Sequence, residues 1–402
     1  MPSFRLLASG QFTSTVGDYC YAVAIPWLVL SSHGSPALLG FVMACYGIPR
    51  MALIPAGGIL ADKVGPRTLM LYSDIGRGAA VLVLTLLASR HAASLAALGP
   101  PGAVVGAGEG LFLPASFSIV PALLDSQRLA AGNALSTATV SAGSLIGPAL
   151  GAGLVALTRA STAAFAVDAA SFVVSTLTLT LIPRQAVPGS HAAVAAARDN
   201  QPSEDAGASA LAFLRQARAV QVILLVVVAA NLGNSGMDAV AVPALAYAKW
   251  GPAGFGALLA CAAAGMTIGS LAGARTNRIL PAKLFTFAVF GIAVAFCAVP
   301  FIGEAGAAAA MLVSGACIGL ANVVVLTVVQ NQIPSAVLGR VMSLFMLCAF
   351  GSYPVSVLAA GQFVHHLGPV PFFPVAGVLL AATMLGGLRV REFRRFGAAG
   401  RP

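Results

Sequence analysis

A chain of 402 residues that is 58% hydrophobic and only 8% charged is not a soluble globular domain, because such domains carry roughly a quarter charged residues. Apolar runs of about 20 residues, the length of a membrane-spanning helix, recur along the whole sequence. They lack the alternation of barrel strands, and within lipid each run must satisfy its own backbone hydrogen bonds. The composition predicts an all-α integral membrane protein.

Twelve segments are predicted to span the membrane, six on each side of a polar stretch. They are residues 6–31, 37–61, 68–90, 99–123, 131–157, 162–182, 219–247, 253–274, 282–302, 306–330, 340–364 and 369–388. The first is expected to be an uncleaved anchor, since no signal-peptide cleavage site follows it. The chain thus divides into an N-terminal six-helix bundle (1–182), a cytoplasmic linker (183–218) whose composition is typical of disorder, a C-terminal six-helix bundle (219–388) and a basic tail (389–402).

The basic residues indicate the orientation. With a cytoplasmic N-terminus, seventeen Lys and Arg residues lie inside and three (Arg90, Arg159, Lys249) outside, which satisfies the positive-inside rule. The net charge of +10 therefore reflects topology and contact with anionic lipid, not nucleic-acid binding. Nineteen Arg against three Lys, with abundant Ala, suggest a GC-rich bacterium. We expect a bacterial cytoplasmic membrane, with both termini cytoplasmic.

A polar stripe occurs once in each half of the chain. Its members are Gln11, Ser14, Thr15 and Asp18 in the first span, and Asn231, Asn234, Ser235 and Asp238 in the seventh, offset by 220 residues without a gap. Pro148 and Pro354 repeat in the same way, offset by 206. Unrelated apolar helices would rarely share such a stripe, so the two bundles are predicted to be pseudo-symmetric, as in many secondary transporters.

Acidic residues inside the spans are the candidates for proton coupling. A carboxylate at such depth costs on the order of 3 kcal/mol on insertion scales and usually faces the bundle interior or a watery cavity. A desolvated carboxyl can carry a proton reversibly, which makes Asp18, Glu109 and Asp238 candidates. The alternative is a hydrogen-bonded structural carboxyl, and this alternative is favoured for Asp168, which could pair locally.

A second group of charges is predicted to be mainly structural. Asp74 and Arg77 are spaced i, i+3 on one helix face, and Arg50 lies at a similar depth in the second span. These three residues are expected to form a buried Arg–Asp–Arg cluster.

Several kinds of site are excluded by the sequence. None of the three lysines sits in a GK[ST] phosphate loop, so an ATP-driven pump would need a partner subunit. GAGEG (106–110) lies inside an apolar helix with no strand before it, so its glycines are expected to serve close helix packing. No nucleophile triad, zinc motif or CxxC spacing occurs. We expect no enzyme, no cofactor, no metal and six free cysteines.

The stretch GGILADKVGPR (57–67) resembles the signature between the second and third helices of the major facilitator superfamily. The resemblance implies a cytoplasmic gate formed by Gly58, Asp62, Gly65, Arg67 and Asp125. In that gate Gly57 and Gly58 allow close packing and Gly65 makes a tight turn. Asp62 would lie at the N-terminus of helix 11, near 335–340, and Arg67 would pair with Asp62 and Asp125. The alternative is an ordinary positive-inside turn.

GSLIGPALGAG (143–153) resembles the antiporter motif of helix 5. Gly143, Gly147, Pro148 and Gly151 match, whereas Ala152 replaces the last glycine. The resemblance implies export against protons, with this helix packed on the second half of the chain. The alternative is plain glycine-mediated helix packing.

A finer resemblance, to the macrolide- and siderophore-exporting branch of the drug:proton antiporters, rests on FRLLASGQFTSTVGDYCYAVAIPWLVL, FLPASFSIVPAL and FAVDAASF. It implies a monomer that exports an amphipathic small molecule by proton antiport through alternating access, with a cavity lined by helices 1, 4, 7 and 10. Helix 4 lacks the buried Arg common in drug antiporters and carries Glu109 instead. The candidate cavity residues are Gln11, Thr15, Tyr21, Phe112, Phe117, Asn231, Asn234 and Asn322.

The acidic cavity favours cationic or neutral lipophilic cargo. The alternatives are a proton-coupled symporter for metabolite uptake and a non-transporting membrane scaffold or sensor.

Overall fold

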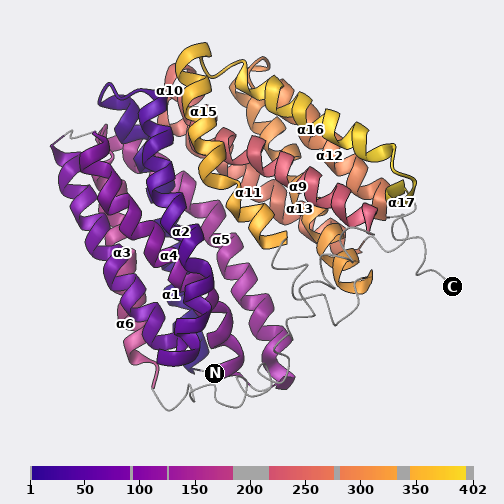
Figure 1. The fold of residues 1–402 in the computed structure, drawn as a ribbon. Helices are drawn as coiled ribbons and strands as arrows, with labels where there is room; N and C mark the ends of the chain where they lie inside the picture. Colours follow the sequence, from indigo (N-terminus) through magenta and orange to yellow (C-terminus); the bar gives the residue numbers. More distant parts are fainter. Residues whose placement is uncertain are drawn as a thin grey trace. The chain divides into compact units, whose positions relative to one another are not determined.

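The computed structural model describes residues 2–90, 94–124, 126–183, 217–275, 281–332 and 345–394 (Figure 1). Within these ranges the chain forms helices and no strand. The first half contains α1 (Pro2–Ser31), α2 (Pro36–Val64), α3 (Pro66–Ser89), α4 (Leu95–Leu123), α5 (Ser126–Thr158) and α6 (Thr162–Leu181). The second half contains α9 (Arg218–Gly236), the π-helix η2 (Met237–Ala241), α10 (Val242–Lys249), α11 (Gly251–Arg275), α12 (Pro281–Ala298), α13 (Gly303–Gln332), α15 (Tyr353–Leu367), α16 (Phe372–Leu388) and α17 (Arg391–Arg394).

Ten helical segments in the described residues are long and apolar enough to cross a membrane. One of them, Arg218–Lys249, joins α9, η2 and α10, and another runs from Phe345 to Leu367. Together with α1, which is 30 residues long, and the shorter apolar helix α16, they account for the twelve predicted spans. The prediction of an all-α, multi-pass membrane protein is confirmed.

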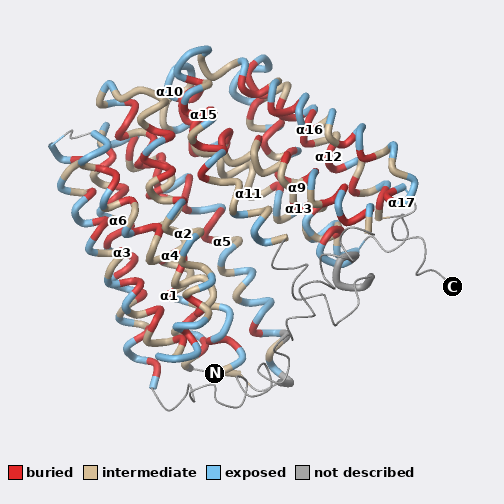
Figure 2. Tube along the Cα trace, viewed as in Figure 1, coloured by how far each residue is buried: buried red, intermediate tan, exposed pale blue. Residues whose placement is uncertain are grey.

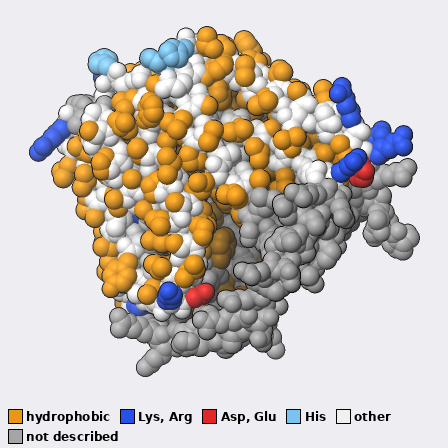
Figure 3. All heavy atoms as spheres, in the orientation of Figure 1, with side chains coloured by type: hydrophobic (Ala, Val, Ile, Leu, Met, Phe, Trp, Pro, Cys, Tyr) orange, Lys and Arg blue, Asp and Glu red, His pale blue; other side chains and the backbone are white. Residues whose placement is uncertain are grey.

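Large apolar side chains cover much of the outer surface. Leu157 is 86% exposed, and many other Leu, Ile, Val and Phe residues are exposed as well (Figures 2 and 3). Few charged side chains interrupt the described part of the face drawn in Figure 3. Such a surface is unsuited to water but matches the hydrocarbon interior of a bilayer.

The helices cluster into two compact units. The first contains α1 to α6 together with Ala246–Ala260, which ends α10 and begins α11. In it α1 packs against α5 and α6, α3 packs against α4 and α6, and α2 packs against α4. The second unit contains the remaining described helices, in which α12 packs against α13 and α16, and α9 packs against α15 and α16.

The linker and the tail are only partly covered by the structure. Residues 184–216, which make up most of the predicted linker, lie outside the described residues, so the linker stays a prediction. The start of the predicted tail packs on the second unit, because Phe393 of α17 is buried with its ring 6.2 Å from that of Phe285.

Glycines bring the same pair of helices together in each unit. In the first, a side chain at Gly106 or Gly110 of α4 would collide with the backbone carbonyl oxygens of Tyr46 and Arg50 in α2. The packing role expected for GAGEG is thus confirmed. In the second unit, Gly265 and Gly269 of α11 face backbone carbonyls of α13 in the same way. These are the second and fourth spans of each half, which supports the internal repeat.

Candidate functional site

A cavity of about 350 Å³ lies within the first unit. Its lining comes from α1 to α5 and includes all four members of the first polar stripe. The lining residues are Gln11, Ser14, Thr15, Asp18, Tyr19, Ala22, Tyr46, Arg77, Glu109, Phe112, Leu113, Ser116 and Val140. Most of the cavity surface is apolar, but polar and charged side chains are numerous on its wall, as suits a site for an amphipathic small molecule.

Local helix packing explains why the stripe faces the cavity. Residues spaced i, i+3, i+4 and i+7 share one face of a helix. On another face of α1, Gly17 packs against α6 so closely that a Cβ there would lie 2.6 Å from Oδ1 of Asp168. The absence of a side chain at Gly17 fixes this face against α6 and leaves the polar face free.

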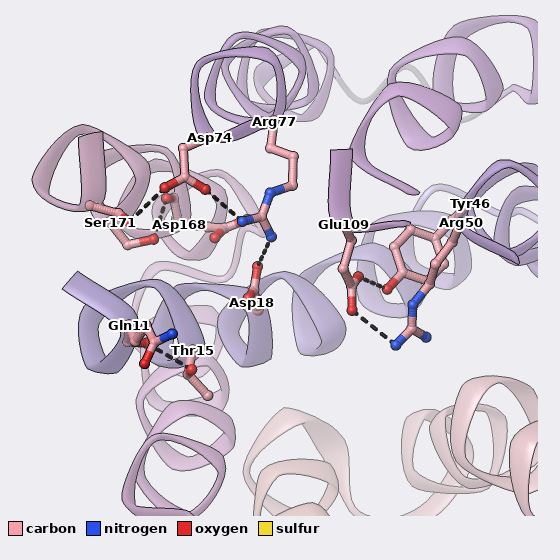
Figure 4. A network of polar contacts seen from close by, with 11 residues as sticks. Gln11, Thr15, Asp18, Tyr46, Arg50, Asp74, Arg77, Glu109, Asp168 and Ser171 are labelled. Carbon is pink, nitrogen blue, oxygen red and sulfur yellow. Dashed lines mark hydrogen bonds and ion pairs between the residues drawn. The ribbon is translucent and has the colours of Figure 1, made fainter. Parts of the chain in front are cut away.

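Arg77 of α3 binds two acids unequally (Figure 4). Its Nη2 donates to Oδ1 of Asp74 at 2.6 Å, and its Nη1 lies 3.5 Å from Oδ1 of Asp18. Ser175 of α6 donates to the other carboxylate oxygen of Asp74 at 2.6 Å. Asp74 is fully buried, whereas 42% of the Asp18 side chain is exposed. Asp74 is thus held as a permanent partner of Arg77, and Asp18 lies at the open end of the network.

Two aromatic rings hold the guanidinium of Arg77 in place. Its Cζ lies 4.6 Å from the ring centroid of Phe112 and 4.5 Å from that of Phe172. Cations are attracted to aromatic faces at such distances. The arginine is therefore fixed by stacking and by Asp74, and a change in the charge of Asp18 leaves it with a partner.

Arg50 belongs to a different group of charges. Its Nη2 lies 3.0 Å from Oε1 of Glu109, and the hydroxyl of Tyr46 donates to the other carboxylate oxygen of Glu109 (Figure 4). The predicted cluster of Arg50, Asp74 and Arg77 is therefore wrong for Arg50. The reason is that close packing of α4 on α2 brings Glu109 to Arg50, while Asp74 is taken up by α3 and α6.

Asp168 does not pair locally as expected. It is 1% exposed, and both of its carboxylate oxygens are buried without a hydrogen-bond partner among the described residues. The nearby hydroxyl of Ser171 donates instead to the backbone oxygen of Asp168, at 2.7 Å. This carboxyl is in the same polar interior as Asp18 and Arg77 (Figure 4), but it forms no ion pair among the described residues.

The helix 5 motif packs on α1 and on the start of α11. A Cβ at Gly143, Gly147 or Gly151 would lie 2.7, 2.5 or 2.8 Å from atoms of Thr15, Tyr19 and Cys20, respectively. On another side of α5, the carbonyl of Pro148 and the methyl group of Ala152 face Gly256. The motif glycines, which were expected to contact the second half of the chain, thus contact α1. Pro148 and Ala152 are the motif residues that contact α11, at Gly256.

The turn between α2 and α3 has part of the predicted gate geometry. Gly65 has φ +86°, a conformation that favours glycine, and its N–H donates to Ala61 O at 3.0 Å. Arg67 donates to the backbone oxygens of Leu179 (2.8 Å) and Thr180 (3.0 Å) at the end of α6. Asp62 is exposed.

Two of the glycines in that turn behave differently. Gly57 packs against Pro114 of α4, whereas a Cβ added at Gly58 would meet nothing within 4 Å among the described residues, so the packing expected of the pair is seen only at Gly57. Asp125 and the 335–340 segment lie outside the described residues, so their part in the gate stays a prediction.

The other candidates have varied surroundings. Tyr21 is buried behind the cavity, with its ring 6.4 Å from that of Tyr46 and 5.9 Å from that of Phe165. Phe117 is 72% exposed and is not among the residues that line the cavity. In the second unit, Asn322 is exposed.

Asp238 lies in the π-helix η2 and accepts a hydrogen bond from Nδ2 of Asn234 at 2.8 Å. Asn231 donates to the backbone oxygen of Val227. The two stripes thus differ, since Asp18 faces an arginine and Asp238 faces an amide.

Three residues that complete the site were not singled out from the sequence: Tyr46, Phe172 and Ser175. Tyr46 precedes Arg50 by four residues, a spacing that places both on one helix face, so it could have been found. Phe172 and Ser175 lie in an ordinary apolar helix, and only the packing of α6 on α3 shows that they serve Arg77 and Asp74.

Comparison with known proteins identifies the family. The family model of the Major Facilitator Superfamily matches residues 7–357. YfiS of Bacillus subtilis (strain 168), an uncharacterized MFS-type transporter, is 25% identical over 97% of this chain and 94% of its own length. The enterobactin exporter EntS of Citrobacter koseri is 26% identical, over 98% and 93%.

Solved structures agree on the fold. A mutant of the peptide transporter POT in complex with sulfate has a TM-score of 0.78 at 13% identity, covering 98% of this chain and 95% of the other. A bacterial homologue of the iron transporter ferroportin, in its inward-facing state, has a TM-score of 0.75 at 14% identity, covering 96% and 98%. These proteins are transporters and not enzymes, in line with the expectation from the sequence. The chain is a multi-pass membrane transporter and belongs to the Major Facilitator Superfamily.

Proposed function

We propose that this transporter exports an amphipathic small molecule in exchange for protons. The observation that carries the proposal is the position of Asp18, an acid on the cavity wall with 42% of its side chain exposed and a partner 3.5 Å away. A group that is both accessible and weakly held can exchange a proton with the cavity. Asp74, which is buried and bonded at 2.6 Å, cannot do so as readily.

The charged residues in the interior of α1 to α6 have a net negative charge that protons can balance. Away from their ends, α1 to α6 carry four acids (Asp18, Asp74, Glu109 and Asp168) and two arginines (Arg50 and Arg77), so 4 − 2 = 2 negative charges are in excess when all are ionised. Two protons would balance them. Uncompensated charge in a membrane interior is costly, and a cationic cargo or a proton can each reduce that cost. Competition between the two at Asp18 couples their movements in opposite directions.

The cavity wall supports an amphipathic cargo. Phe112, Leu113 and Val140 provide apolar surface, and Gln11, Thr15 and Ser116 provide groups for hydrogen bonds. The accessible charge on this wall is negative, because the side chain of Arg77 is only 2% exposed. These features favour a cationic or neutral lipophilic molecule, such as a drug or a macrolide-like compound. The similarity to EntS, named as an enterobactin exporter, keeps a siderophore among the candidates and supports efflux.

The remaining parts of the proposal follow from the sequence. The transporter resides in a bacterial cytoplasmic membrane, with both termini in the cytoplasm, as the basic residues indicate. It works as a monomer in contact with anionic lipid. The GSLIGPALGAG motif supports antiport, and Asp238 and Glu109 are further candidates for coupling.

The test is reconstitution into liposomes that enclose a pH-sensitive dye. A proton gradient is imposed, and a lipophilic cation, a macrolide or a siderophore is added outside. We expect cargo to trigger proton movement in the opposite direction, and we expect Asp18→Asn to abolish it. Cargo and protons moving in the same direction would favour a symporter. Cargo movement without protons would remove Asp18 from coupling, and silence for every compound would favour a scaffold or sensor. Liposomes without protein are the control for leakage.

A further inference from the structure

We infer that Asp168 binds a proton in the resting protein and is a second proton-binding site, behind Asp18. The role of Asp168 in coupling rests on the proposed function, whereas the presence of a bound proton does not. It starts from the orphaned carboxyl of Asp168, which is 1% exposed with neither oxygen in a hydrogen bond among the described residues.

Among the described helices around Asp168 the nearby cation is Arg77, and its ion pairs are with Asp74 and Asp18, not with Asp168. The groups facing it are Asp18 and the thiol of Cys20 on α1, Arg77 and Asp74 on α3, and Glu109 on α4. Arg77 is already bound to Asp74 and Asp18 and is held by Phe112 and Phe172. A buried carboxylate without a cation or hydrogen-bond donor is strongly unfavourable, whereas a neutral carboxyl avoids that cost.

The hydroxyl of Ser171 does not change this conclusion. It is the closest polar side chain to the position of Gly17, but its proton is donated to the backbone oxygen of Asp168 at 2.7 Å. While the hydroxyl donates to the backbone, its oxygen stays available to accept a hydrogen bond from a protonated carboxyl. This arrangement suits a protonated Asp168.

Asp168 lies beside α1, the helix that carries Asp18 on the cavity wall. Gly17 lets α6 approach until Oδ1 of Asp168 would be 2.6 Å from a Cβ at that position. Asp18 is the next residue and points to the cavity. Two carboxyls so close to one backbone turn repel each other when both are charged, so they lose their protons in sequence. Asp18 exchanges first, because it is exposed and faces Arg77, and Asp168 retains its proton longer.

The test is infrared spectroscopy of the purified full-length protein in lipid nanodiscs, with 13C-labelled aspartate. We expect at neutral pH a carbonyl band of a protonated carboxyl that carries the isotope shift. The band should disappear in Asp168→Asn and persist in Asp18→Asn, Asp74→Asn and Asp238→Asn. A spectrum with no such band, or one that Asp168→Asn leaves unchanged, overturns the inference.

The measurement needs no cargo, so it is independent of the transport assay. If Asp168→Asn does not fold, the labelled wild type and the three other variants still decide. In liposomes, we expect Asp168→Asn to move fewer protons per cargo than the wild type. An unchanged ratio with the infrared band lost would overturn the coupling role. Failure of antiport in the wild type, with the band present, would overturn the proposed function and leave the bound proton established.

Discussion

The carboxylate of Asp18 lies 3.5 Å from the guanidinium of Arg77, at the boundary between a buried ion network and an open cavity. The same guanidinium donates to Asp74 at 2.6 Å. One arginine thus serves an accessible acid loosely and a buried acid tightly. The structural and the exchangeable roles fall on different carboxyls, although both face one cation.

The first prediction compares Asp18→Asn with Asp74→Asn. Removing the partly exposed Asp18 charge should cost at most about 1 kcal/mol of unfolding free energy, because Arg77 keeps Asp74. Removing the Asp74 charge should cost about 3–5 kcal/mol, since it breaks a buried pair and releases the Ser175 hydrogen bond. Thermal unfolding of the purified variants in the same detergent measures the difference. Equal losses would show that the two acids share the structural role.

The second prediction concerns Arg50, Glu109 and Tyr46. Neutralising Arg50 (Arg50→Gln) or Glu109 (Glu109→Gln) should destabilise the protein, and the double variant should lose less than the sum, with a coupling of about 0.5–3 kcal/mol. Tyr46→Phe should cost about 1 kcal/mol, because it removes one hydrogen bond to the carboxylate. Thermal unfolding supplies all of these values. Additive single losses would indicate that the Arg50–Glu109 pair contributes nothing to stability.

The sequence predicted the membrane fold well because the length of a hydrophobic span is set by the thickness of the lipid, not by partner helices. The polar stripe of α1 could also be placed, since helical spacing alone puts Gln11 and Asp18 on one face. The assignment of Arg50 failed for a different reason. Depth along a helix does not specify which neighbouring helix a side chain faces, and glycine contacts between α2 and α4 decide the partner of Arg50.

The same limit applies to Phe117 and Tyr21. Both were chosen because aromatic residues occur in the right helices, but Phe117 is exposed away from the cavity lining and Tyr21 is buried beside Tyr46. Rotation of a helix about its axis is set by packing, and an apolar helix in lipid has little amphipathic pattern to reveal it. Charged residues are more predictable than aromatic ones, because lipid excludes them from the outer face.

The third prediction concerns Arg67, which donates to the last carbonyls of α6 at Leu179 and Thr180. Arg67→Ala should destabilise the protein by about 1–3 kcal/mol, because charge-assisted hydrogen bonds to backbone oxygens are lost at a helix C-terminus. Arg67→Lys should recover part of the loss, since lysine keeps the charge but not the planar pair of donors. Thermal unfolding tests both variants. Wild-type stability of Arg67→Ala would show that these contacts are dispensable for folding.

The fourth prediction tests whether the glycines of the helix 5 motif act only by packing α5 against α1 or also take part in the transport cycle. Gly147→Ala places a methyl group 2.5 Å from Cβ of Tyr19 and 2.9 Å from the backbone oxygen of Val16, so α5 and α1 must move apart. We expect a loss of about 1–3 kcal/mol in unfolding free energy, the usual cost of overpacking. Because Tyr19 lines the cavity, transport in liposomes should fall as well.

Gly153→Ala is the matched control for this change. It lies in the same helix and has nothing within 4 Å of the added methyl group, so alanine should be neutral or slightly stabilising through its better helix propensity. A Gly147→Ala protein with wild-type stability but no transport would indicate a role in the transport cycle beyond packing. Loss of both properties in parallel, with Gly153→Ala unaffected, would indicate that the helix 5 glycines act by holding α5 against the wall of the cavity.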